Sequence, residues 1–178
     1  MVLDHNQIQE ALKEEENRKY FDDKDVRVMM EKRFLEMEQL IDELYDLCCL
    51  EAKKHCDGFH NAKSDFRRLG QDFGFISAFV RQHKGSNEFT FKRRYLGEKK
   101  EGETRGPVYR HPIKKIGGKY TRSALSPWSS HQDELNLALM TEEHFQRLRE
   151  MGSFLKAQKR AFKRVESRKM IPKTEQPK

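Results

Sequence analysis

The stretch FGFISAFVRQHKGSNEFTFKRRYL, residues 73–96, decides the fold class because it is rich in aromatic and β-branched side chains. Two such runs are separated by a short polar segment that contains Gly85-Ser86. This pair suits a two-residue type II′ turn, in which glycine supplies the positive φ angle. We therefore predict a β-hairpin over residues 73–96.

The turn also predicts which side chains share a face of the hairpin, because successive residues of a strand point to opposite sides. The predicted cross-strand pairs on one face are Lys84–Asn87, Gln82–Phe89, Val80–Phe91, Ala78–Arg93 and Ile76–Tyr95. This face is mostly apolar, so we assign it to the core, with Arg93 extending outward near an edge. The opposite face carries Phe75, Ser77, Phe79 and Arg81 on the first strand, and Thr90, Lys92 and Arg94 on the second. One face can then pack in a core while the other contacts phosphate groups.

The segment after the hairpin, residues 97–125, is basic and contains several glycines. We expect GEKKEGETRG, residues 97–106, to form a mobile loop. VYRHPIKKI, residues 108–116, predicts a third strand that Pro112 keeps at an edge of the sheet. GGKYTRSAL, residues 117–125, then ends the sheet region with a further turn.

A long helix is predicted over residues 23–57, with Gly58 at its end. Its apolar residues follow the 4–3 spacing of a heptad seam, and we expect them to be buried: Met30, Phe34, Met37, Ile41, Leu44 and Cys48. Leu40 and Leu47 widen this stripe. A stripe of this length needs a partner, which is either the C-terminal helix of the same chain or the same helix of a second chain.

A second helical region is predicted over residues 126–169, beginning at Ser126-Pro127. Thr141, followed by two glutamates, has the pattern of a second helix start and predicts a bend near Met140. Near-heptad spacing relates Phe145, Leu148, Gly152, Leu155 and Phe162. The far end is basic, with Lys156, Lys159, Arg160, Lys163, Arg164, Arg168 and Lys169.

The predicted fold is therefore α+β, with a small antiparallel sheet (the hairpin and a third strand) packed on two long helices. We divide the chain into an acidic leader at residues 1–22, a single domain at residues 23–169 and a disordered tail at residues 170–178. Within the leader, residues 4–20 have the pattern of a short, charged, frayed helix.

The charge of the chain is distributed unevenly. Of its 178 residues, 35% are hydrophobic and 37% are charged, and the net charge is +7. Residues 1–60 hold 9 Lys and Arg against 16 Asp and Glu, whereas residues 61–125 hold 16 against 6. Such a basic segment is typical of proteins that bind nucleic acids. No signal peptide or apolar stretch of membrane-spanning length is present, so we expect a cytoplasmic protein that does not enter a membrane.

The sequence offers no catalytic or metal-binding motif. GGKYT, residues 117–121, lacks the upstream glycine of a phosphate-binding loop, and no GxSxG or paired-cysteine zinc pattern occurs. Cys48, Cys56, His55 and His60 would come near one another on a helix, but the cysteines fit an apolar seam better. We expect reduced thiols, no metal, no cofactor and no enzymatic activity.

The basic hairpin and the segment after it are the candidate DNA-binding surface. Cations alternate there with aromatic and small side chains, which suits contact with a sugar-phosphate backbone. The candidate residues are Arg81, Lys84, Lys92, Arg94, Arg110, Lys114, Lys115, Lys119 and Arg122.

The chain also resembles MobI-type mobilization proteins of conjugative plasmids and integrative conjugative elements, over roughly residues 40–168. The resemblance lies in the hairpin, in PVYRHPIKKIGGKYTRSAL (residues 107–125) and in HFQRLREMGSFLKAQKRAFKRV (residues 144–165). It implies a non-catalytic factor that acts on double-stranded DNA at an origin of transfer and helps the relaxase nick its site. No catalytic residue carries over, and the basic hairpin residues carry over only as DNA contacts.

Two other functions remain open from the sequence. The protein could be a DNA-binding transcriptional regulator of a mobile element, or a helical scaffold that binds another protein. The acidic N-terminal helix would contact the relaxase or a second subunit, and a homodimer is one of the alternatives.

Overall fold

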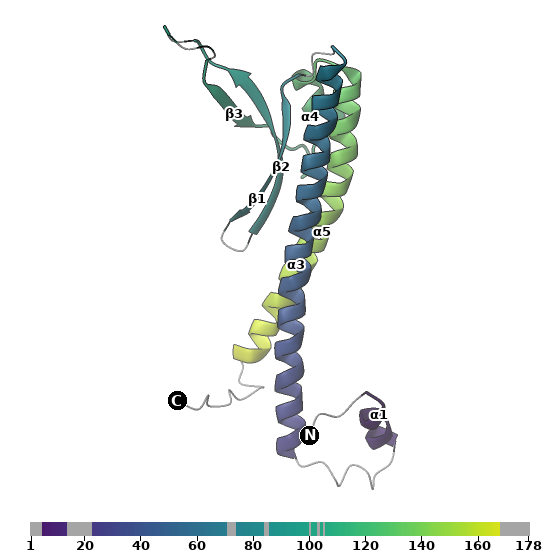
Figure 1. Cartoon of the computed structure of the whole chain (residues 1–178). Coiled ribbons are helices and arrows are strands. Elements are labelled where there is room, and N and C mark those ends of the chain that lie inside the picture. Colours follow the sequence, from purple (N-terminus) through teal and green to yellow (C-terminus); the bar gives the residue numbers. More distant parts are fainter. Residues whose placement is uncertain are drawn as a thin grey trace. The chain divides into compact units, whose positions relative to one another are not determined.

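The computed structural model describes residues 5–13, 23–70, 74–83, 86–99, 101–102, 104 and 106–167. Its main elements are two long helices, α3 (Asp23–Arg68) and α5 (Gln132–Ser167), and one sheet (Figure 1). The chain divides into two compact units. One comprises residues 1–44 and 155–178, and the other comprises residues 45–154.

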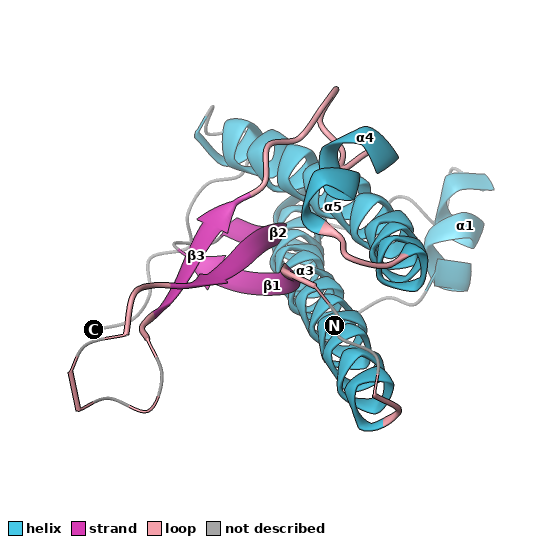
Figure 2. Cartoon of the chain, turned by 90° about the horizontal axis from the view of Figure 1, so that it is seen from above, coloured by secondary structure: helices cyan, strands magenta, loops and turns pink. Residues whose placement is uncertain are grey.

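The sheet lies entirely in the unit of residues 45–154. It has three antiparallel strands in the order β1 (Ile76–His83), β2 (Ser86–Leu96) and β3 (Val108–Pro112). Figure 2 shows the sheet beside the helices, so the predicted α+β class is confirmed. The hairpin and the third strand at an edge are confirmed as well, although the third strand ends at Pro112 instead of continuing to Ile116.

The predicted register of the hairpin is wrong by two residues. Val80 pairs with Phe89 and Ala78 with Phe91, and Ser86 belongs to β2 because it pairs with His83. Lys84 and Gly85, on which the predicted turn type depended, lie outside the described residues. A shift of two residues leaves every side chain on its predicted face, because the strand period is two.

The core of this unit surrounds Phe91, which has no exposed surface. Its ring centroid lies 6.0 Å from that of Phe59, 5.1 Å from Tyr120 and 5.6 Å from Phe145. These rings come from α3, from the segment before α4 (Arg122–Leu125) and from α5. The apolar face of the hairpin therefore packs in the core as predicted. Tyr95 is an exception: its side chain is 38% exposed.

Helix α3 does not end at Gly58 but continues to Arg68. A glycine inside a helix costs about 1 kcal/mol relative to alanine. Burying a phenylalanine side chain contributes about 1.5–3 kcal/mol, and the next residue, Phe59, is 1% exposed. Burial on the second half of the helix thus outweighs the local preference of the glycine.

The free edge of β1 lies against α3. The Cys56 thiol and the His60 ring each bond the carbonyl oxygen of Ala78, at 3.2 and 2.9 Å. One turn further on, Lys63 Nζ donates to the carbonyl oxygens of Gly74 and Ile76, at 2.9 and 2.5 Å. Polar side chains on one face of α3 therefore satisfy an edge that would otherwise be open to pairing with another chain.

Helix α5 begins at Gln132 and continues through Thr141 without a second start. The Thr141 hydroxyl donates to the Leu137 carbonyl oxygen inside the helix. Glu142 is buried, where it accepts a hydrogen bond from the Tyr120 backbone N–H and pairs with Arg149. The acidic pattern that indicated a helix start is therefore a buried tertiary contact. The predicted start at Ser126-Pro127 is a short 3-10 helix, η1 (Ser126–Trp128).

In the other unit, α3 and α5 pack against each other. The Phe34 and Phe162 rings lie 5.5 Å apart, and Lys159 Nζ lies 2.6 Å from both carboxylate oxygens of Asp42. The partner of the heptad seam is therefore the C-terminal helix of the same chain. Within the seam Ile41 is buried, as are Cys48 in the unit of residues 45–154 and Leu155 on α5.

Half of the predicted seam is exposed. Met30, Met37 and Leu44 keep 51%, 48% and 46% of their surface, so the prediction that they are buried is wrong. They lie along the edge of the stripe, beside the line of Phe34, Ile41 and Cys48 that is covered.

The leader contains one described helix, α1 (His5–Lys13). The tail predicted to be disordered lies outside the described residues. Among the described residues, no helix is both long and apolar enough to cross a membrane.

Candidate nucleic-acid interface

The sheet face opposite Phe91 is basic, and we call it the outer face. Odd-numbered residues of β1 and even-numbered residues of β2 and β3 point to this side. Its members include Ser77, Phe79, Arg81, Thr90, Lys92, Arg94 and Arg110, together with Glu88, Leu96, Val108 and Pro112. The alternation predicted from the sequence placed the first six of them on this face.

Two cations of the outer face lie over the ring of Phe79, a residue of β1. Lys92 Nζ lies 4.9 Å from the ring centroid, and the Arg110 guanidinium carbon lies 5.2 Å from it. A ring attracts cations over its face through its quadrupole. Phe79 therefore holds the ends of two basic side chains, from β2 and β3, close to one point of the surface.

Arg94 and Arg110 are direct cross-strand neighbours. In the part of the chain that the structure describes, neither of them, nor Lys92, forms an ion pair with a carboxylate. Like charges directly opposite each other destabilise a sheet. Arg81 differs, because its cross-strand neighbour is Glu88.

A cavity of about 230 Å³ adjoins this face beside α3. It is lined by His60, Lys63, Ser64, Arg67, Gly74, Ser77 and Arg94. Lys63 is buried and turned toward Glu134, with 2.5 Å between Nζ and Oε1. Burial lowers the pKa of Lys63, and the charges of Arg67 and Arg94 act in the same direction, against the effect of Glu134. The positive charges of Arg67 and Arg94 therefore act on the Lys63 ammonium group in the lining of the cavity.

The remaining predicted site residues have no observed contact that links them to this group within the described part of the chain. Lys84 lies outside the described residues. Lys115 Nζ lies 5.4 Å from the centroid of Tyr120, whose ring packs on Phe91 on the core side, and burial lowers its pKa. Arg122 donates to the side chain of Asn136. Lys114 and Lys119 are exposed.

Arg67 was missed in the sequence because we ended the helix at Gly58. The spacing of seven residues between Ala52, Phe59 and Phe66 could have revealed the continuation. This spacing continues the apolar face of the helix past Gly58 to its last turn, which contains Arg67.

The cluster of histidine and cysteine side chains on α3 is used in packing. His55 stacks on the His144 ring with 3.8 Å between centroids, while Cys56 and His60 bond the edge of β1. Among the described residues, no group of three or more His, Cys, Asp or Glu side chains is arranged to hold a metal ion.

Comparison with known proteins identifies the family. The family model described as MobI protein matches residues 48–163, about two thirds of the chain. The chain belongs to the MobI family. The resemblance described from the sequence is thereby confirmed, and MobI membership implies a role in conjugative mobilization, in an accessory family not known for catalysis. Neither the curated proteins nor the solved structures gave a match.

The MobI match includes the outer face and the cavity beside it. Arg67, Lys92, Arg94 and Arg110 all lie within residues 48–163. It excludes α1 and the first half of α3. The part of the chain that relates it to other MobI proteins is therefore mainly the unit of residues 45–154.

Proposed function

We propose that this MobI protein binds double-stranded DNA at an origin of transfer and, without catalysing a reaction itself, helps the relaxase begin DNA transfer. Family membership supports the mobilization role. The charge of residues 61–125, with 16 Lys and Arg against 6 Asp and Glu, supports a polyanionic partner.

The observation that carries the DNA-binding proposal is the uncompensated pairing of Arg94 with Arg110. Two arginines at directly opposite positions of neighbouring strands repel each other, and a local arrangement that costs stability commonly marks a functional site. A phosphate group near both would remove the repulsion and form charge-assisted hydrogen bonds. Lys92, held over the Phe79 ring, adds a third cation.

The cavity beside α3 extends this surface with groups suited to a DNA backbone. Arg67 and Arg94 provide charge, while Ser64 and His60 add polar side chains to the same lining. Contacts of this kind position a protein on the duplex without reading its sequence. We therefore expect affinity that depends strongly on salt, because phosphate contacts release bound counterions.

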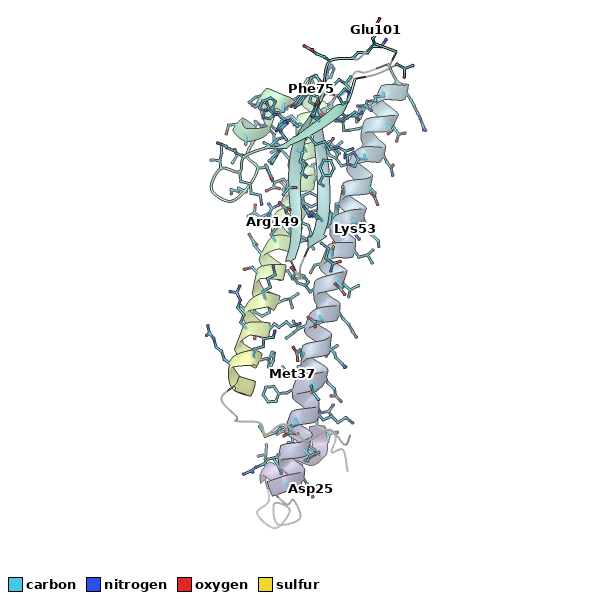
Figure 3. All side chains as sticks on the ribbon, turned by 90° about the vertical axis from the view of Figure 1, so that its left-hand side faces the viewer. Asp25, Met37, Lys53, Phe75, Glu101 and Arg149 are labelled. Atoms are coloured by element: carbon cyan, nitrogen blue, oxygen red, sulfur yellow. The ribbon has the colours of Figure 1, made fainter. Side chains whose placement is uncertain are left out.

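The test replaces two charges on the outer face and two elsewhere. In the first variant Arg94→Gln is combined with Arg110→Gln. The control combines Lys53→Gln with Lys54→Gln, two exposed cations of α3; Figure 3 marks Lys53. Each variant is titrated by fluorescence anisotropy, at several salt concentrations, against a duplex carrying the origin of transfer of its own element.

The outer-face variant should bind the duplex more weakly, and its slope of log affinity against log salt should flatten by about 0.9 for each phosphate that the protein no longer neutralises. Its melting temperature should not fall, since the replaced charges repel each other. The control should keep the slope of the parent. If the outer-face variant binds as tightly as the parent with an equal slope, the outer face does not contact DNA. The basic end of α5, residues 156–167, then becomes the leading candidate.

Two further measurements separate the proposal from its alternatives. A footprint over the whole element should place the protein at the nick site, whereas a transcriptional regulator would protect promoters. Adding the protein to the purified relaxase should increase nicking of a supercoiled origin plasmid. A helical scaffold would show no salt-sensitive DNA affinity in the anisotropy titration.

A further inference from the structure

A stack of exposed rings lies on the sheet face opposite the outer face, beyond the core. Tyr95 of β2 lies 5.3 Å from Tyr109 and 5.2 Å from His111 of β3, measured between ring centroids. The planes are nearly parallel, at 26° and 13°. The Tyr95 hydroxyl is 2.6 Å from His111 Nε2, which fixes the two rings relative to each other. We call Tyr95, Tyr109 and His111 the ring stack.

A cation and an indole continue the ring stack along β2. The Arg93 guanidinium carbon lies 5.9 Å from the Tyr95 ring centroid and 4.5 Å from that of Trp128. The Trp128 carbonyl oxygen accepts a hydrogen bond from the Phe75 N–H, which joins η1 to the start of the hairpin. From Tyr109 to Trp128, two tyrosine rings are therefore followed by a guanidinium group and then by an indole ring.

Part of this arrangement has a structural reason. Cross-strand aromatic pairs stabilise a sheet, and the Tyr109 ring covers Gly97, where an added Cβ would come within 2.4 Å of it. However, Tyr95 and Tyr109 are 38% and 47% exposed. Stabilisation of the sheet edge does not explain why these rings remain accessible to solvent. In Figures 1 and 2, β3 lies on the side of the sheet away from α3 and α5.

We infer that the ring stack, with Arg93 and Trp128, is a binding platform for the unpaired bases of single-stranded DNA. Bases stack on aromatic side chains and on guanidinium planes, and nearby cations hold the phosphates between them. In a duplex the base faces already cover one another, so the rings can reach only bases that are unpaired. Residues 61–125, the basic segment that contains Arg93 and the ring stack, provide the complementary charge.

This inference goes beyond duplex binding and does not depend on it. The outer face and the ring stack use alternate residues of the same strands, Arg94 and Arg110 on one side and Tyr95 and Tyr109 on the other. A duplex and an adjoining single strand could thus be held on opposite faces of one sheet.

The experiment uses Trp128 as an intrinsic probe, because it is the only tryptophan of the chain. Full-length protein is titrated with oligothymidine of about 16 nucleotides, within the site sizes of single-strand binders, and with an abasic oligonucleotide of equal length. Oligothymidine should quench the tryptophan fluorescence and bind more tightly than the abasic strand, which carries the phosphates without the bases. Equal affinities for the two strands would overturn the inference.

The matched variants are Tyr109→Val, which removes the ring but keeps a strand-favouring residue, and Tyr109→Phe, which keeps the ring. The valine variant should lose about 5- to 150-fold in oligothymidine affinity, the effect of losing one stacked base. The phenylalanine variant, which keeps the ring, is the matched control and should change that affinity less than about twofold. Unchanged affinity of Tyr109→Val would refute the platform.

Loss of folding cannot imitate this result, because the abasic comparison is made on the parent protein and the melting temperature of each variant is measured. Failure of the proposed duplex function would appear instead in the Arg94→Gln, Arg110→Gln variant, as an unchanged salt slope. The two outcomes are independent of each other.

Discussion

Replacing Lys63 by methionine should destabilise the protein by about 3–5 kcal/mol, because it breaks a buried ion pair. Lys63 Nζ donates to Glu134 Oε1 and to the carbonyl oxygens of Gly74 and Ile76. The two side chains are only 7% and 0% exposed. Methionine fills a similar volume but leaves the Glu134 carboxylate and the carbonyl oxygens of Gly74 and Ile76 without this donor.

The size of the loss follows from the buried carboxylate more than from the missing hydrogen bonds. Each carbonyl that loses its donor costs about 1–3 kcal/mol, and these costs are not additive with that of the unpaired charge. For a chain of this length, each kcal/mol lowers the melting temperature by roughly 2–4 °C. We therefore expect a fall of roughly 6–20 °C for Lys63→Met.

Urea unfolding followed by far-UV circular dichroism measures the free energy of unfolding of each variant. Glu134→Gln removes the charge but keeps the shape, so the double variant should be more stable than the sum of the two single losses predicts, by about 1–3 kcal/mol. Arg68→Met is the control, because Arg68 and Asp65 form an exposed pair on the same helix; its loss should be below about 1 kcal/mol. A loss below about 1 kcal/mol for Lys63→Met, or simple additivity in the double variant, would refute the reasoning.

Two other predictions concern the seam and the thiols. Ile41→Ala should lower the free energy of unfolding by about 2–5 kcal/mol. Met37→Ala, at a position that is 48% exposed, should lower it by less than about 1 kcal/mol. Urea unfolding measures both values, and equal losses would contradict the observed burial. The pKa of the Cys56 thiol is raised to about 11, chiefly by burial, so at pH 9 the folded protein should react with iodoacetamide at Cys56 roughly fifty-fold more slowly than the urea-unfolded chain. Since the folded state keeps a proton that the unfolded chain releases, the contribution of Cys56 to stability should be complete below pH 9 and fall toward pH 11. Peptide mass mapping measures the rates, and similar rates in both states would count against a buried thiol.

The sequence was sufficient for the features that depend on local pattern. Alternation with a period of two predicted the hairpin and its two faces, and an error of two residues in the register did not change which face Phe91 or Lys92 takes. Pro112 predicted the edge strand because it lacks a backbone donor. The heptad spacing predicted a long helix that needs a partner, although it could not choose between the same chain and a second chain.

The candidate site was only partly predictable from the sequence. Lys92 and Arg94 could be placed on the outer face because alternation along a strand is a local rule. That Arg110 lies directly across from Arg94 depends on the pairing of β2 with β3, across a connection of more than ten residues. Arg67 comes from a different helix, and nothing in the hairpin sequence indicates that it lies beside Arg94.

Tertiary structure alone decided which apolar and aromatic side chains are covered. Met37 and Ile41 belong to the same heptad pattern, yet only Ile41 is buried, because a single neighbouring helix covers just part of a wide stripe. Tyr95 and Phe91 share a face of β2, yet only Phe91 lies over the helices. Periodicity fixes the direction of a side chain relative to its own element, whereas burial depends on how far the neighbouring elements extend. That extent is set by packing between residues distant in the sequence, and no local pattern carries it.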